Sequence, residues 1–70
     1  MTKRIFRVYL KPDAPRTEVT RLFRDSLTVQ KGVGYDRAKK MSYIDLEFEN
    51  GSESFLSEYK SAICETSAIR

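Results

Sequence analysis

Alternation of apolar and polar side chains over residues 41–49, MSYIDLEFE, limits the fold of this chain more than any other feature. In an extended segment, one row consists of Ser42, Ile44, Leu46 and Phe48, and the other of Met41, Tyr43, Asp45 and Glu47. Because successive side chains of a strand point to opposite faces, this period of two predicts a half-buried strand whose first row faces the core. The second row poses the functional question, since Tyr43 sits there either to stack on a ligand or as ordinary surface.

A second alternating run, near residues 4–11, predicts another strand. Its rows are Phe6, Val8 and Leu10 on one side, and Ile5, Arg7 and Tyr9 on the other. The aromatic and β-branched residues of this run favour an extended chain. The following sequence PDAP contains two prolines, and these are expected to end the strand.

Residues 16–26, RTEVTRLFRDS, are expected to form a helix, because Val19, Leu22 and Phe23 keep a spacing of three to four residues. A strand through TEVTRLF is the alternative interpretation. Residues 27–33 then predict a short strand, which is followed by the basic, glycine-bearing turn GYDRAKK.

A second helix is expected over residues 52–65, where apolar side chains gather on one face. The remaining sequence ETSAIR is long enough only for a frayed helix end or a stub of strand. The expected order is therefore β-α-β-β-α, in one domain over residues 1–70. Such an order predicts an α+β sandwich, with two helices on one face of an antiparallel sheet and the other face open to solvent.

The absence of histidine and the presence of a single cysteine, Cys64, restrict the chemistry of this chain. Without histidine the chain lacks the commonest general base, and one cysteine leaves no soft metal site. We therefore expect no enzymatic activity, no metal and no cofactor. A lone cysteine is typical of a reducing compartment, so an intracellular location, cytoplasmic or nuclear, is expected. The sequence has no run of about 18 apolar residues, so no membrane partner is expected.

The net charge of +3 is unevenly divided along the chain. Residues 1–40 contain 11 basic and 4 acidic residues, whereas residues 41–70 contain 2 basic and 6 acidic ones. This division indicates a basic region that attracts a polyanion. The alternative interpretation is that the two halves neutralise each other in the folded chain.

The order of elements and the local patterns over residues 4–64 resemble the RNA recognition motif (RRM) family. VYL at 8–10 is similar to the start of the family's hexamer motif, EVTRLF at 18–23 to its first helix, and YIDLEFEN at 43–50 to its octamer strand and the following turn. The octamer motif reads K/R-G-F/Y-G/A-F-V-x-F/Y. An alignment that ends on Phe48 places Tyr43 at the first aromatic position and Asp45 at the second. The resemblance implies an RRM-like, ferredoxin-like βαββα(β) sandwich, truncated at its fourth strand.

The resemblance implies that the open face of the sheet binds single-stranded RNA, by stacking unpaired bases on aromatic rings. Tyr9 and Tyr43 would stack on bases, and Arg7 would contact a phosphate or a base. The basic turn would hold the RNA backbone, and Gln30 or Thr28 would read base edges. The full set of candidate RNA-binding residues is Tyr9, Tyr43, Arg7, Arg37, Lys39, Lys40, Lys31 and Gln30.

Two features of the residues support a different interpretation. Asp45 and Glu47 place negative charge beside Tyr43, which repels phosphate, and either can form a cross-strand pair with Arg7. A missing fourth strand would also leave a bare sheet edge. The alternative function is therefore a protein-interaction module, which docks a partner protein or forms a homodimer through its sheet face or edge.

Overall fold

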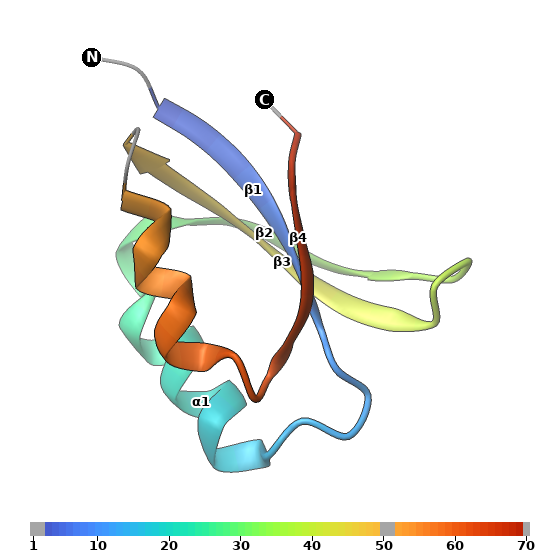
Figure 1. Ribbon diagram of the computed structural model, residues 1–70. Coiled ribbons are helices and arrows are strands. Elements are labelled where there is room, and N and C mark those ends of the chain that lie inside the picture. The colour runs from blue at the N-terminus through green and yellow to red at the C-terminus, as the bar shows by residue number, and fades with distance from the viewer. Residues whose placement is uncertain (1–2, 50–51, 70) are drawn as a thin grey trace.

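The computed structural model describes residues 3–49 and 52–69, which form an α+β fold with a four-stranded antiparallel sheet (Figure 1). The elements in chain order are β1 (Lys3–Leu10), α1 (Arg16–Asp25), the 3₁₀ turn η1 (Leu27–Val29), β2 (Gln30–Asp36), β3 (Met41–Glu49), the 3₁₀ helix η2 (Ser52–Tyr59) and β4 (Ile63–Ala68). The strand order across the sheet is β2-β3-β1-β4. The turn expected at Asn50 lies outside the described residues.

The core lies between the sheet and the helical segments, α1 and η2, which cover the same face (Figure 1). The two alternating runs of the sequence are the central strands, β1 and β3, as predicted. Val8, Ile44 and Leu46 come from the rows predicted to face inward, and none of the three has exposed surface. Leu22 of α1 is equally buried against them. The period of two therefore sorted the core side chains correctly.

The helix expected over residues 16–26 is confirmed as α1, and the alternative strand is wrong. Val19 and Phe23, one turn of helix apart, pack against the core beside the buried Leu22. The apolar stripe thus decides the conformation of this segment.

No helix in the described residues has the length and apolarity to span a membrane.

The strand predicted over residues 27–33 is misplaced, because the chain makes one more tight turn before it extends. Ser26 is fully buried, and its backbone N–H and its Oγ both donate to the Leu22 carbonyl, at 3.0 and 2.6 Å. Val29 N–H then donates to the Ser26 carbonyl at 3.0 Å. These local bonds keep residues 27–29 in the turn η1, so β2 begins at Gln30.

The second helix predicted over residues 52–65 is also wrong, since η2 is a 3₁₀ helix that ends at Tyr59. Leu56, Tyr59 and Ala62 are all buried and recur every three residues. Three residues per turn is the 3₁₀ period, so this spacing places Leu56 and Tyr59 of η2 against the core, whereas the buried Ala62 lies in the turn that follows η2.

The end of the chain forms a complete strand, which corrects the expected truncation. β4 pairs with β1 in antiparallel register, with Phe6 opposite Ala68 and Leu10 opposite Ile63. This pairing gives hydrogen-bond partners to the free edge of β1, which otherwise would lie bare. The edge strands of the sheet are therefore β2 and β4.

Candidate functional site

The outer face of the sheet, opposite α1 and η2, has no helix over it in the described residues (Figure 1). The outer rows of β1 and β3 meet there, with Arg7 opposite Asp45 and Tyr9 opposite Tyr43. These four side chains contact one another, so the face expected to be open is filled by its own polar and aromatic groups.

Arg7 is held by Asp45 and covers the ring of Tyr43. Its Nε donates to Asp45 Oδ1 at 2.9 Å and its Nη2 to Oδ2 at 3.1 Å, which makes the pair bidentate. The guanidinium carbon lies 4.0 Å from the centroid of the Tyr43 ring, a cation–π distance. The hydrogen bond that Arg7 donates to Asp45 raises the pKa of Arg7 above its already high value. The cross-strand pair anticipated as an alternative is thus present.

Tyr9 is enclosed, with only 7% of its surface exposed. Its ring meets Tyr43 edge to face, with centroids 6.0 Å apart, and its hydroxyl donates to Asp36 Oδ2 at 3.2 Å. Lys39 Nζ lies 4.9 Å from the Tyr9 centroid and pairs with Glu65 of β4. That contact with Glu65 raises the pKa of Lys39. The ammonium group of Lys39 therefore lies over the ring of Tyr9.

The β2–β3 turn is organised by Asp36. Its Oδ1 accepts the backbone N–H groups of Ala38 and Lys39, at 2.9 and 3.1 Å. These bonds, first among them the one from Lys39, lower the pKa of the Asp36 carboxyl. Arg37 and Lys40 are exposed, and in the described part of the chain neither forms an ion pair.

The two glycines of β2 create the space in which Tyr43 lies. Gly34 is paired with Tyr43 and Gly32 with Asp45. A Cβ at Gly34 would lie 2.6 Å from Tyr43 Cζ, whereas one at Gly32 would lie 3.7 Å from Asp45 Oδ2. The Tyr43 ring therefore rests on the bare backbone of Gly34.

The two remaining candidate RNA-binding residues, Lys31 and Gln30, lie in different environments. Lys31 forms an ion pair with Glu47 at 3.4 Å, so its charge is already balanced. Gln30 is paired with Leu46 of the inner row, and its Nε2 donates to the Phe23 carbonyl at 2.9 Å. Gln30 thus lies on the helix-covered side of the sheet. From there it cannot contact a base that stacks on the tyrosines of the outer face. The structure brings together Arg7, Tyr9, Tyr43 and Lys39.

Sequence reasoning missed two residues that shape this face, Asp36 and Glu65. Asp36 was detectable, because aspartate followed by a basic turn is a common start for a side-chain-capped turn. Glu65 was not, because its approach to Lys39 depends on β4, in a segment whose sequence predicts a helix and its frayed end.

No family model, curated protein or solved structure matches this chain. The class of the protein is therefore defined by its own fold and face: a small α+β domain with a four-stranded antiparallel sheet, and with cations stacked on two outward-facing tyrosines.

Proposed function

We propose that this domain binds single-stranded RNA through the outer face of its sheet and the β2–β3 turn, in the manner of an RRM-like module. The observation that carries the proposal is that a cation lies on the ring of each central tyrosine, Arg7 on Tyr43 and Lys39 on Tyr9. Groups that bind phosphate thus stand directly beside rings that stack on bases. The strand order β2-β3-β1-β4 supports the comparison with that fold, although η2 replaces a full second α-helix.

Binding in this arrangement is an exchange of carboxylates for phosphates. A phosphate presents Arg7 with two oxygens, as Asp45 now does, so it can replace the Asp45 carboxylate without loss of bidentate geometry. Lys39 and Glu65 have 42% and 43% of their side-chain surface exposed. An ion pair this exposed contributes little, so Lys39 leaves Glu65 easily. Its departure would remove the ammonium group that lies over the ring of Tyr9.

The turn supplies the first attraction for the RNA. Arg37 and Lys40 are exposed, and their charges are not paired within the described residues. Charges of this kind draw in the RNA backbone before any base stacks, and their effect falls as salt rises. The domain should therefore bind RNA weakly and with a clear dependence on salt.

An amide NMR titration with a degenerate short single-stranded RNA tests the proposal, at about 50 and about 200 mM salt. We expect shifts centred on Tyr9, Tyr43 and residues 37–40 that shrink at the higher salt. If these amides stay still at millimolar RNA, the domain is not an RNA-binding module.

A specific observation favours a second candidate function, docking of a protein on the edge strand β2. Val33 and Tyr35 are 57% and 58% exposed there. The outer edge of β2 has no neighbouring strand in the described residues, and such an edge can accept a further strand. Sedimentation velocity over a range of protein concentrations tests self-association by this edge, and a monomer at all concentrations would exclude it.

A further inference from the structure

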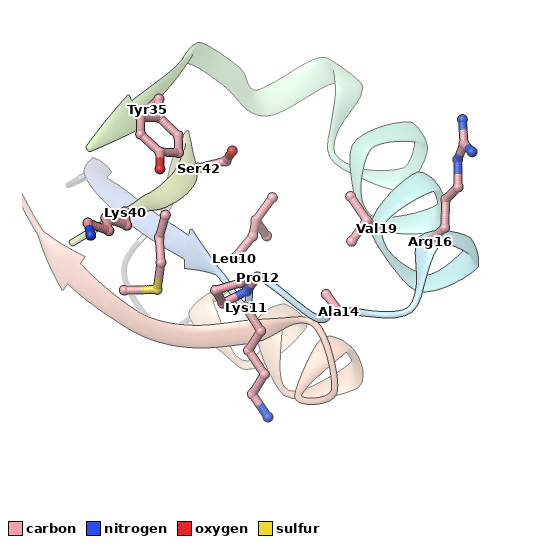
Figure 2. A pocket seen from close by; sticks show the side chains of 10 residues that line it. Leu10, Lys11, Pro12, Ala14, Arg16, Val19, Tyr35, Lys40 and Ser42 are labelled. Atoms are coloured by element: carbon pink, nitrogen blue, oxygen red, sulfur yellow. The ribbon is translucent and has the colours of Figure 1, made fainter. Parts of the chain in front are cut away.

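A cleft of about 400 Å³ opens on the helix-covered side of the sheet, between the start of α1 and the β2–β3 hairpin (Figure 2). It lies on the side opposite Tyr9 and Tyr43, because Leu10 of the inner row lines it. Its lining consists of Leu10, Lys11, Pro12, Ala14, Arg16, Val19, Tyr35, Lys40, Met41 and Ser42. The hairpin extends past the helical layer, which leaves this end of the inner face uncovered (Figure 1).

The cleft combines an apolar interior with a basic rim. Leu10 lies between Tyr35 on the hairpin and Val19 on α1 (Figure 2). Lys11, Arg16 and Lys40 come from three separate segments around it, and the side chains of Lys11 and Arg16 extend outward from the rim (Figure 2). No acidic side chain occurs among the ten described residues of the lining. Its charge is therefore complementary to an anion that also carries an apolar group.

Lys40 adds an independent observation, because its backbone is strained. Its φ of 57° lies in the left-handed region, where glycine or asparagine is favoured over lysine. A left-handed residue commonly closes a short hairpin loop such as the one between Asp36 and Met41, and non-glycine residues in this conformation are also enriched at binding sites. At this position the strain places a lysine on the rim of the cleft.

We infer that this cleft binds one nucleotide of a single-stranded RNA, with the base against Tyr35 and its phosphate beside Lys40, while Lys11 and Arg16 at the rim attract the neighbouring phosphates of the strand. The inference rests on the proposed function and adds a second site to it. The ring of Tyr35 is 58% exposed, unlike that of the enclosed Tyr9, so a base can stack on it without displacing a cation. A volume of about 400 Å³ is within the range of pockets that hold small ligands.

The turn connects this cleft to the outer face. Lys39 lies over Tyr9 on the outer side, whereas its neighbour Lys40 lines the cleft on the inner side. Arg37 is exposed in the same turn. A single strand that follows these cations passes around the hairpin from one site to the other, which favours RNA over an acidic peptide as the occupant.

The test uses a degenerate hexaribonucleotide and amide NMR, with Tyr35→Thr and Lys40→Gly as variants and Lys60→Gln as a control. Threonine keeps the β propensity of the edge strand while it removes the ring. We expect RNA to shift the amides of Lys11, Tyr35 and Met41, and Tyr35→Thr to weaken that response at least about fivefold.

Lys40→Gly separates binding from stability. Glycine relieves the strain at φ 57°, so the thermal midpoint should rise or stay unchanged while RNA binding at the cleft weakens. Lys60→Gln removes one exposed charge from outside the cleft and should leave the cleft response nearly unchanged.

The other outcomes distinguish this inference from the proposed function and from other ligands of the cleft. If RNA shifts the amides of Tyr9 and Tyr43 but none in the cleft, this inference is overturned and the proposed function is retained. If RNA shifts no amide of the domain, both this inference and the proposed function are overturned. If inorganic phosphate alone moves the cleft amides as RNA does, and Tyr35→Thr has no effect, the cleft is an anion site and not a nucleotide site. Cleft shifts with an acidic leucine-containing peptide, but not with RNA, would assign it to a protein.

Discussion

At the scale of single residues, Asp45 has two opposed effects. It orients Arg7 through two hydrogen bonds, and so holds the guanidinium over Tyr43. The same carboxylate repels an RNA phosphate that approaches Arg7. In the alignment with the RRM octamer it occupies the position of the second aromatic residue, so under the proposed function a base would meet Tyr43 and a charge pair instead of two rings.

Asp45→Asn should therefore bind RNA more tightly and fold less stably than the natural chain. Removal of this partly buried, repulsive charge should increase RNA affinity by about two- to fivefold. The loss of the bidentate pair should lower the thermal midpoint. Fluorescence anisotropy with labelled RNA and thermal unfolding measure the two effects. Glu58→Gln makes the same charge change on η2, and an equal gain in affinity there would show that Asp45 acts only through net charge.

At the scale of elements, Gly34 of β2 is explained by the Tyr43 ring of β3, which packs on this strand. Gly34 leaves room for the Tyr43 ring, and this ring in turn supports Arg7 and Tyr9. Glycine usually weakens a strand, because it adds conformational freedom to the unfolded chain and has no side chain to pack. Here the cost is offset by the packing of an aromatic ring from the neighbouring strand.

Gly34→Ala and Gly32→Ala form a matched pair of substitutions that tests this packing. A Cβ at Gly34 enters the space of the Tyr43 ring, so we expect a loss of about 1–3 kcal/mol in the free energy of unfolding. A Cβ at Gly32 meets Asp45 at 3.7 Å, an ordinary contact, and should cost little or stabilise the strand. Denaturant unfolding measures both, and equal effects would contradict the role of the Tyr43 ring.

The helical segments are joined by a hydrogen bond from the hydroxyl of Tyr59 in η2 to Asp25 at the end of α1. This bond lowers the pKa of Asp25 below its ordinary value of 3.8. It also raises the pKa of Tyr59 above 10.0. The folded state therefore favours carboxylate and neutral phenol together. Its contribution to stability is present between the two ordinary values, and is lost as pH falls through the folded pKa of Asp25 or rises through that of Tyr59.

Tyr59→Phe removes the bond and keeps the buried ring. The variant should melt at a lower temperature than the natural chain near pH 7. The difference in thermal midpoint should shrink as pH falls below 3.8, because a protonated Asp25 no longer gains from the bond. Asp36 also titrates in this range, but it does so equally in both proteins. A difference that stays constant down to the lowest pH would contradict the assignment.

At the scale of the whole molecule, the uneven charge of the chain is partly balanced by the fold. The pairs Arg7–Asp45, Lys31–Glu47 and Lys39–Glu65 each join the basic first half to the acidic second half. The interpretation that the halves neutralise each other is therefore correct for the sheet. Lys11, Arg16, Arg37 and Lys40, around the cleft and the turn, have no such pair among the described residues.

These four cations set the expected salt dependence of RNA binding, because Arg7 and Lys39 already hold a carboxylate that a phosphate would only replace. Four phosphate contacts on a single strand give a slope of log affinity against log salt of about −3. Arg37→Gln should bring this slope closer to zero by about 0.7. Arg24→Gln removes a guanidinium on α1 that is already paired with Asp25, and should leave the slope unchanged. A slope that Arg37→Gln does not alter would exclude the turn from the RNA contact.

The sequence by itself determined the inner layer of this protein. Alternation in β1 and β3 separated the inward-facing side chains from the outward-facing ones, because the strand period depends only on local geometry. The inward-facing side chains are Val8, Ile44 and Leu46, and the outward-facing ones are Arg7, Tyr9, Tyr43 and Asp45. The stripe around Leu22 likewise determined α1. The grouping of Arg7, Tyr9 and Tyr43 on one face could be predicted for the same reason.

Only the tertiary structure decided how the chain ends and what its outer face offers. Residues 63–68 are extended because β1 provides a free edge, a partner more than fifty residues away in the sequence. That pairing brings Glu65 to Lys39, just as the β2–β3 register lays Tyr43 on Gly34. The cleft likewise needs the hairpin, the β1–α1 loop and α1 in place together. Contacts between distant segments leave no periodic signal in a sequence, so the folded chain alone establishes them.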